Sequence, residues 1–262
     1  FSGETPVEKF LSPVVATVTP LVDQEEVAQI FRKYDVVTLP VVDEQGHLLG
    51  RILHDDVVDV LEEEAEEDAL RMAGTDMEEL LYRDRALPIA RVRMPWIAVN
   101  LVGSLMCAFL LHLYEGVLSQ AILLASFIPV ITAMSGNVGT QSATILIQGL
   151  AKDRIDLSDV PLLLFKDGRV GLIMGGLAGV GCGLVAGFLF GGVRPFLGLV
   201  VFLAMFTAMS FATVIGALAP ATMKRFGVDP AIAASPIVTT TNDILGIVIY
   251  MTTAVVFLDR IA

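Results

Sequence analysis

Five long apolar segments fill the last two thirds of the sequence, and they constrain its fold more than any other feature. They cover residues 96–114, 120–150, 170–191, 196–219 and 231–258. A helix needs about 20 apolar residues to cross a bilayer, and each segment approaches or exceeds that length. The sequence therefore predicts an all-α polytopic membrane domain of five transmembrane helices over residues 95–262.

Basic residues divide unevenly between the loops on the two sides of these segments. The loops 81–94, 151–169 and 220–230 hold ten Lys or Arg, whereas the opposite side holds only Arg194 and Arg260. Cytoplasmic loops carry an excess of Lys and Arg. We therefore expect a multi-pass protein of the plasma (inner) membrane, with its N-terminal region in the cytoplasm and its C-terminus outside.

The N-terminal region has the pattern of a small α+β domain over residues 1–61. Residues 14–20 resemble a strand, and "VDQEEVAQIFRKY" (22–34) has apolar residues at helical spacing. "TLPVVDEQGHLLGRIL" (38–53) predicts a strand, a turn at Glu44–Gly46 and a second strand. An acidic helix predicted over 56–80 then runs from this domain into a connecting segment, 62–94, that leads to the membrane.

Asp243 interrupts the fifth apolar segment with a charge that the bilayer disfavours by at least about 2.5–3.5 kcal/mol. The interiors of all five segments contain no Lys or Arg to neutralise it. Asp243 belongs to a mostly polar stripe whose residues recur at helical spacing on one face of the segment: Ser235, Thr239, Asn242, Asp243, Gly246 and Tyr250. This stripe predicts the wall of a water-lined path; a protonated Asp243 bonded to a neighbouring helix is the alternative.

The second apolar segment breaks its own pattern over residues 128–144. Three residues there would loosen a helix, Pro129, Gly136 and Gly139, and three are polar, Asn137, Thr140 and Gln141. Loosened backbone is tolerated in a membrane where it lines a cavity, and it would offer carbonyl and amide oxygens. In the alternative interpretation, Asn137 and Gln141 only bond neighbouring helices.

These groups are hard oxygen ligands without Cys or His among them, which favours Mg²⁺, Ca²⁺ or Mn²⁺. One Asp per chain is few for a dication, so we expect a two-fold dimer with the ion on its axis. The formal net charge of −12, concentrated in residues 55–68, makes nucleic acid an unfavourable partner. Nucleophile, phosphate-loop and zinc-protease motifs are absent from the sequence, so an enzyme is not expected.

Acidic residues also cluster on one face of the connecting helix: Asp56, Asp59, Glu63 and Glu67, with Glu64 and Asp68 beside them. Like charges this dense repel one another, and a bound cation would relieve the repulsion. A solvated acidic face is the alternative. A further regular feature is a glycine every four residues from Gly171 to Gly191, which predicts close helix packing, with a moving gate helix as the alternative.

Several motifs resemble known families. Leu39–Asp43, Gly46, Gly50, Asp55 and Asp56 resemble a CBS domain, although Leu53 stands where many such domains carry the Ser or Thr that binds a nucleotide, so nucleotide binding is doubtful here. "MSGNVGTQSATILIQGLA" (134–151), "GVDPAIAASPIVTTTNDILGIVIY" (227–250) and "DDVVDVLEEEAEED" (55–68) resemble the MgtE family of magnesium channels. The resemblance covers a second CBS domain, a connecting helix and five spans, without the family's N-terminal helical domain and first CBS domain.

The resemblance implies a homodimer whose pore lies on the two-fold axis, lined by the second and fifth helices. Asp243 matches the family's pore aspartate, Asn137 its amide and Thr239 the position one turn earlier; Gly136 and Gln141 complete the expected pore set. Cytosolic Mg²⁺ sites that close the pore match these acidic residues: Asp23, Glu25, Asp56, Asp59, Glu64, Glu67 and Asp68. The expected function is a Mg²⁺-selective channel gated by internal Mg²⁺. An H⁺- or Na⁺-coupled carrier of Mg²⁺ or Co²⁺ and a membrane-anchored sensor are the alternatives.

Overall fold

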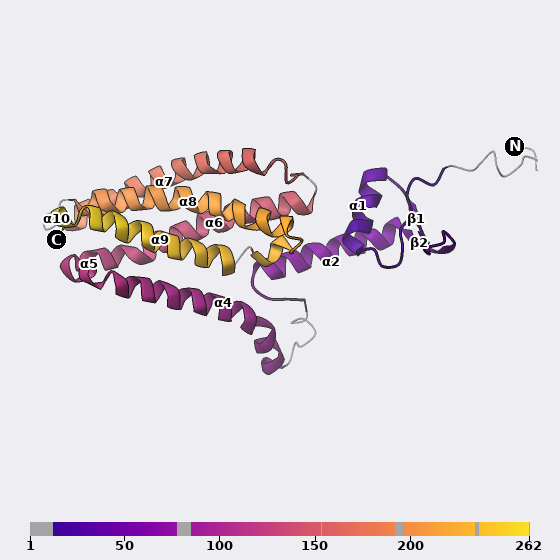
Figure 1. The fold of residues 1–262 in the computed structure, drawn as a ribbon, viewed down its shortest axis with the longest axis horizontal. Coiled ribbons are helices and arrows are strands. Elements are labelled where there is room, and N and C mark those ends of the chain that lie inside the picture. Colours follow the sequence, from indigo (N-terminus) through magenta and orange to yellow (C-terminus); the bar gives the residue numbers. More distant parts are fainter. Residues whose placement is uncertain (1–12, 78–84, 153, 192–195, 234–235, 262) are drawn as a thin grey trace, which may run out of the picture. The chain divides into compact units, whose positions relative to one another are not determined.

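The protein is described by a computed structural model that covers residues 13–77, 85–152, 154–191, 196–233 and 236–261. The chain forms two compact units, Phe1–Ala69 and Leu70–Ala262. The first is a small domain with a two-stranded sheet, and the second is a bundle of long apolar helices (Figure 1). The predicted class, an all-α membrane domain preceded by a small α+β domain, is confirmed.

The first unit is built from α1 (Gln24–Tyr34), β1 (Thr38–Val42), β2 (Leu48–Leu53) and most of α2 (His54–Met72). The two strands pair antiparallel, as the strand–turn–strand pattern predicts. Val27, Phe31, Leu39 and Val57 are buried together, so the apolar stripes of both helices close over the sheet. The strand expected at residues 14–20 is reduced to a single bridge between Val18 and Val41.

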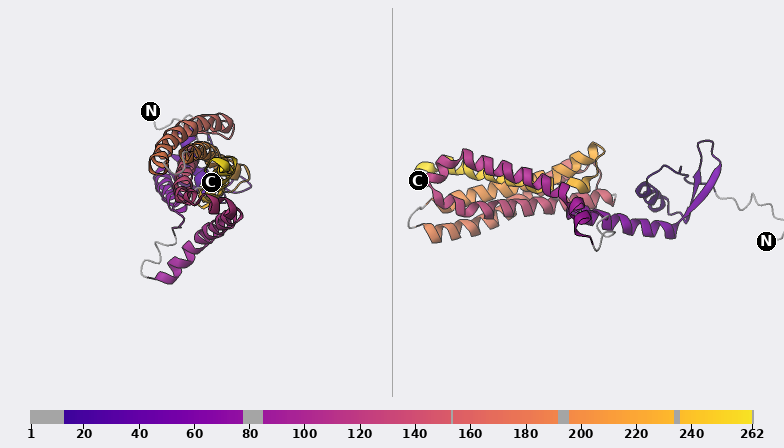
Figure 2. Two further views of the ribbon diagram at one scale, coloured as in Figure 1. Left: turned by 90° about the vertical axis from the view of Figure 1, so that its left-hand side faces the viewer. Right: turned by 90° about the horizontal axis from the view of Figure 1, so that it is seen from below.

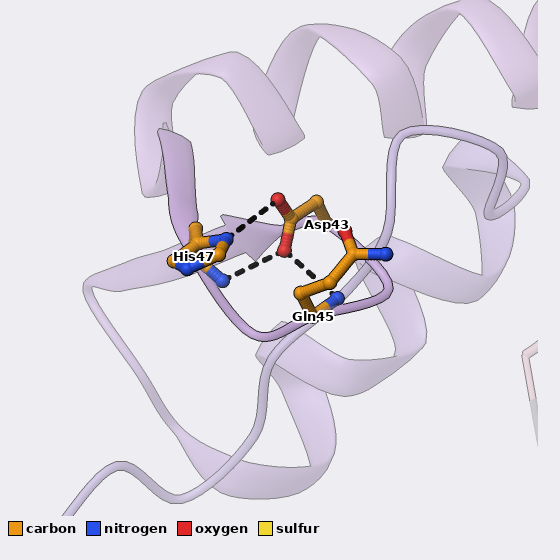
Figure 3. A network of polar contacts seen from close by, with 3 residues as sticks. All are labelled: Asp43, Gln45 and His47. Carbon is orange, nitrogen blue, oxygen red and sulfur yellow. Dashed lines mark hydrogen bonds and ion pairs between the residues drawn. The ribbon is translucent and has the colours of Figure 1, made fainter.

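The turn between the strands is organised by Asp43 (Figure 3). Its Oδ1 accepts hydrogen bonds from the backbone N–H groups of Gln45 at 2.9 Å and His47 at 2.7 Å, and its Oδ2 lies 3.0 Å from His47 Nδ1. Gly46, the last residue of the turn, has φ +84°, a conformation that glycine adopts without strain. The hydrogen bond from the His47 backbone is the main reason why the pKa of Asp43 lies below its ordinary value of 3.8; partial burial opposes the shift.

The connecting helix α2 ends at Met72, so the predicted helix over 56–80 is too long. Gly74 has φ +80°, and the N–H of Thr75 bonds back to the carbonyl of Leu70. A left-handed glycine just beyond the last turn is a common helix terminator. The last residues of the predicted helix, 78–80, lie outside the described residues.

The second unit contains five helices long and apolar enough to cross a membrane, counted over the described residues. They are α4 (Ala86–Leu113), the segment Ile122–Ala151 formed by η2 (Ile122–Phe127) and α6 (Ile128–Ala151), α7 (Val160–Phe190), α8 (Leu197–Arg225) and α9 (Pro236–Val256). Shorter helices join or follow them: α5 (Glu115–Gln120), η3 (Pro230–Ala233) and α10 (Leu258–Ile261). The chain is therefore a multi-pass membrane protein.

Helix α8 lies at the centre of this bundle and packs against α6, α7 and α9, while α4 packs along α9 (Figures 1 and 2). Its buried face is rich in small residues such as Ala204, Ala208 and Ala212. Small residues let helix backbones approach closely in a membrane, where packing rather than the hydrophobic effect holds helices together. The buried Tyr250 hydroxyl adds a hydrogen bond to the Leu124 carbonyl at 2.9 Å, which links α9 to η2.

The glycine series of α7 is a packing surface over most of its length. A Cβ added at Gly175, Gly179 or Gly183 would lie 2.8, 3.0 or 2.7 Å from a backbone oxygen of α8. A Cβ at Gly187, in contrast, would meet nothing within 4 Å. The first glycines of the series therefore confirm the close-packing interpretation, whereas Gly187 has room for a side chain although its backbone lies near Gly198 of α8.

Two further predictions, both about the membrane helices, are wrong. Helix α7 begins at Val160, ten residues before the predicted start, so Lys166, Asp167 and Arg169 belong to a helix and not to a loop. Helix α6 is continuous through Gly136 and Gly139, so its backbone is not loosened and its carbonyls are engaged in helix hydrogen bonds. The two glycines serve close approach to other helices instead.

Candidate functional site

The candidate site lies where α6 and α9 approach each other at Gly136. A Cβ added at Gly136 would lie 3.6 Å from Thr239 Cγ2 and 3.7 Å from Asp243 Oδ1. One turn further along α9, a Cβ at Gly246 would lie 3.1 Å from Ser135 Oγ. The Asp243 carboxylate therefore lies directly beside α6 at Gly136, and Gly246 packs on the same helix near Ser135. The structure brings together three of the predicted pore residues, Asp243, Thr239 and Gly136.

The Asp243 carboxylate is half-buried and has no partner of opposite charge. Within the described part of the chain, it makes no hydrogen bond and no ion pair. A charge in an apolar helix bundle is unfavourable unless water, a cation or a proton compensates it. The geometry thus leaves a carboxyl group at the α6–α9 contact without an ion pair or hydrogen bond from the chain's own described groups.

The neighbouring Asn242 fills a tighter position between three helices. Its side chain is 1% exposed and occupies the space where a Cβ at Gly139 would lie. That same Cβ would lie 3.1 Å from the Ala212 carbonyl oxygen of α8. The backbone of Gly139 in turn lies against Gly216 of α8. Neither polar atom of the Asn242 amide has a hydrogen-bond partner among the described residues. The amide is therefore locked beside Asp243 by packing, a role that its place in the polar stripe does not reveal.

In the single chain, the rest of the polar stripe does not form the continuous water-accessible surface that the sequence predicts. Tyr250 is fully buried and uses its hydroxyl for the bond to η2, and Gly246 packs on α6. Ser235 lies outside the described residues. The polar groups that remain partly accessible are Thr239 and Asp243.

The other two predicted pore residues lie on a different face of α6. Asn137 and Gln141 are four residues apart and both are exposed in the single chain. Gln141 lines a cavity between α6, α7 and α8 together with Asp167, Ser142 and Thr213. The structure does not bring Gln141 to Asp243, and Asn137 stays a predicted pore residue without a described contact there.

Three of the seven predicted regulatory residues have local structural roles in the first unit. Asp23 caps α1 by accepting from the N–H of Glu25 at 2.9 Å, and Asp56 accepts from the N–H of Leu53 at 3.0 Å at the start of α2. Glu64 accepts from the Gln24 side chain at 2.7 Å, which ties α2 to the beginning of α1.

The remaining predicted regulatory residues are on α2. Asp59 is exposed, and Glu67 and Asp68 are half-buried and engaged in other interactions. No group of three or more acidic, His or Cys side chains in the described residues is arranged to hold a metal ion. Metal binding by these residues stays a prediction.

An ion pair that the sequence analysis did not identify joins the end of α2 to the segment before α9. Arg71 Nη1 lies 2.6 Å from Asp229 Oδ2, and Asp229 Oδ1 also accepts from the N–H of Ala231 at 2.8 Å. Met72 packs beside this pair against Ile147 of α6 and its buried neighbours. The end of the connecting helix is therefore attached to the helices that form the candidate site.

The chain is similar in sequence to known proteins. The MgtE family profile, described as "Divalent cation transporter", matches residues 128–253, and the CBS domain profile matches residues 7–63. Three curated proteins named "Magnesium transporter MgtE" are similar to the chain. The protein from Thermus thermophilus is 36% identical over 260 residues, covering 98% of this chain and 57% of the relative.

The other two relatives give similar values. The protein from Bacillus subtilis is 33% identical over 258 residues, covering 98% of this chain and 56% of the relative. The protein from Enterococcus faecalis is 38% identical over 237 residues, covering 90% of this chain and 51% of the relative. The chain thus spans a little over half the length of the curated relatives that it matches.

Proposed function

We propose that this chain conducts Mg²⁺ through the membrane down the electrochemical gradient. The premise is that it belongs to the MgtE family of divalent cation transporters through residues 128–253 and carries a CBS domain before them. The observation that carries the proposal is the Asp243 carboxylate. It lies beside Gly136 at the α6–α9 contact, and no described cationic group neutralises it.

The chemistry of this site suits a hydrated dication. Mg²⁺ loses its waters reluctantly and is often bound by one or two carboxylates through its hydration shell. Asp243 would hold such an ion through its waters, and the Thr239 hydroxyl and the Asn137 amide would bind further waters. The Asp243 carboxylate itself stays partly accessible, so a hydrated ion could reach it.

The same count of charges supports a homodimer. Each chain supplies one carboxylate at the site, and one negative charge compensates a dication poorly. A two-fold axis next to α9 would pair Asp243 with its copy in a second chain and double the charge. We propose that the conducting unit is this dimer, with the pore on its axis.

Gating by internal Mg²⁺ is the second part of the proposal. Acidic residues of the CBS domain and of α2 would bind Mg²⁺ in the cytoplasm, with Asp23, Glu25, Asp56 and Asp59 near the start of the two helices and Glu64, Glu67 and Asp68 further along α2. The ion pair between Arg71 and Asp229 supports this proposal, because it attaches the end of α2 to the segment that precedes α9. Movement of α2 would thereby reach the helix that carries Asp243.

Flux into liposomes tests the first part. Asp243→Asn keeps the size of the side chain and removes its charge, so it should reduce Mg²⁺ uptake about tenfold or more, the effect of losing roughly 1.4 kcal/mol of cation attraction. The control is Asp259→Asn, an exposed carboxylate in the same C-terminal part of the chain, which should leave uptake unchanged. Uptake by Asp243→Asn equal to that of the control would refute the proposal.

A coupled carrier is distinguished by electrical recording. A channel gives single-channel Mg²⁺ currents in a planar bilayer, whereas a carrier gives uptake that depends on an imposed H⁺ or Na⁺ gradient and no unitary currents. Loss of the currents in Asp243→Asn would tie the conductance to the α6–α9 site.

A further inference from the structure

The cavity on the opposite side of α6 contains a second buried carboxylate, that of Asp167. The cavity has a volume of about 160 Å³ and lies between α6, α7 and α8. The Asp167 side chain is 8% exposed, and its buried Oδ2 has no hydrogen-bond partner among the described residues. Buried polar groups are nearly always paired, so an unpaired carboxylate oxygen indicates a missing partner.

Oxygen atoms of three other side chains surround this cavity. Ser142 lies beside the Asp167 carboxyl, Thr213 lines the cavity from α8, and Gln141 lies at its exposed rim. The Thr213 hydroxyl donates to the Ser210 carbonyl at 2.9 Å, so its lone pairs remain available to a cation. Together they offer one carboxylate, two hydroxyls and one amide oxygen, the hard ligands of alkali and alkaline-earth cations.

Lys166 is the charged neighbour that competes with a cation for this site. It lines the same cavity, but its exposed ammonium forms no ion pair with Asp167 within the described residues. Its charge nevertheless offsets that of the carboxylate, and the cavity contains no other acidic side chain. The charges of Asp167 and Lys166 already sum to zero, so a dication would leave an excess of two positive charges here and a monovalent cation an excess of one, which is the smaller electrostatic cost.

A proton by itself does not supply the missing partner. A protonated carboxyl carries an O–H that needs an acceptor when it is buried, and Oδ2 has none within hydrogen-bond distance among the described groups. The cavity is large enough for a cation with several waters, because one water needs roughly 10–15 Å³ of such space.

We propose that the cavity between α6, α7 and α8 binds a monovalent alkali cation through the Asp167 carboxylate, with Ser142, Thr213 and Gln141 and bound waters completing its coordination. This site is separate from Asp243, which faces α6 from the other side. The proposal does not depend on Mg²⁺ transport by the chain.

Thermal unfolding of the purified full chain in detergent tests the proposal, in NaCl, KCl or choline chloride at equal ionic strength. An alkali salt should raise the Tm of the wild-type chain above its value in choline chloride, by roughly 3–6 °C at about ten times the dissociation constant. Asp167→Asn should abolish this shift. The control Asp159→Asn, an exposed carboxylate that directly precedes α7, should retain it.

Two further variants separate the possible explanations. Lys166→Gln removes the competing charge, so it should lower the salt concentration needed for half of the Tm shift. Asp243→Asn should keep the full shift even though Mg²⁺ uptake is lost, so a failed flux experiment would refute the proposed function and leave this site standing.

Three results would overturn the proposal. The first is a Tm that responds to pH but to neither alkali salt, which would mean that a proton or water satisfies Asp167. The second is a larger Asp167-dependent shift with Mg²⁺ than with either alkali cation. The third is an alkali shift that Asp167→Asn leaves intact.

Discussion

The crossing of α6 and α8 at Gly139 and Gly216 should be sensitive to the addition of one methyl group. A Cβ at Gly216 would overlap the carbonyl oxygen of Gly139 and lie 2.8 Å from its carbonyl carbon and 2.9 Å from its Cα. These are backbone atoms and cannot rotate away. Because ordinary contact of a Cβ begins near 3.4 Å, all three of these backbone atoms are too close, and the two helices must separate to accept Gly216→Ala.

The net effect on stability combines two opposing terms. Overpacking typically costs about 1–3 kcal/mol, and contact with backbone places this variant at the upper end. Alanine is favoured over glycine in a helix by about 0.8–1 kcal/mol. We therefore expect Gly216→Ala to lower the free energy of unfolding by about 2 kcal/mol. Gly187→Ala in α7 is the matched control, because its Cβ meets nothing within 4 Å and only the favourable term of about 1 kcal/mol applies.

Circular dichroism during heating in detergent measures both variants. The predicted difference of about 3 kcal/mol corresponds to Tm values that differ by roughly 6–12 °C for a chain of this size. Mg²⁺ uptake should fall in Gly216→Ala as well, because a displaced α6 moves Gly136 away from Asp243. If Gly216→Ala is as stable as Gly187→Ala, the backbone contact between Gly139 and Gly216 does not contribute to the stability of the bundle.

Three further predictions concern the first unit and its connection. In a double-mutant cycle, Arg71→Gln and Asp229→Asn should show a coupling of about 0.2–1 kcal/mol that weakens with added salt, and additive effects would exclude the ion pair. The double substitution Glu67→Gln and Asp68→Asn removes two negative charges, so it should weaken inhibition of Mg²⁺ uptake by internal Mg²⁺. Unchanged inhibition would contradict the gating proposal. Asp43 has a folded pKa below its ordinary value of 3.8, so its contribution to stability is present above about pH 3.8 and is lost as pH falls through the folded pKa. The Tm difference between wild type and Asp43→Asn should therefore shrink in acid, and a constant difference would refute the role of the turn.

The membrane architecture could be predicted from the sequence because five long apolar segments have few structural alternatives. The start of α7 could not, because Lys166, Asp167 and Arg169 interrupt its apolar pattern. Charged residues near the end of a membrane helix remain compatible with helix, since long basic side chains extend to the polar interface. The same interruption concealed Asp167, whose burial depends on α6 and α8, two elements that its own sequence neighbours do not reveal.

The prediction of a loosened α6 failed for a related reason. Glycine weakens an isolated helix by up to about 1 kcal/mol, and this local tendency suggested an irregular backbone at Gly136 and Gly139. In a bilayer, the backbone hydrogen bonds have no water to replace them, so the helix persists. Tertiary packing then uses each glycine, Gly136 beside Asp243 and Gly139 beside Asn242 and Gly216.

A continuous α6 also explains why the predicted pore residues divide into two groups. Gly136 lies on the face that contacts Thr239 and Asp243, and its carbonyl accepts a hydrogen bond from the hydroxyl of Thr140, one turn further along, at 3.0 Å. Asn137 and Gln141 each lie about 100° further round the helix, and Gln141 there reaches the cavity beside α7. Helix α6 therefore separates the Asp243 site from the Asp167 cavity and contributes residues to both.

This shared position has a consequence for how the two sites can behave. The contact of Gly139 with Gly216 fixes α6 against α8 at a point between the two sites. If α6 turns or slides to change the space beside Asp243, Ser142 and Gln141 must move with it, because a helix moves as a rigid element. A cation bound at Asp167 would then favour one position of α6 over others. The alkali salt that stabilises the chain should consequently alter Mg²⁺ uptake in the wild type and leave uptake by Asp167→Asn unchanged, and an equal response of both would show that the two sites are independent.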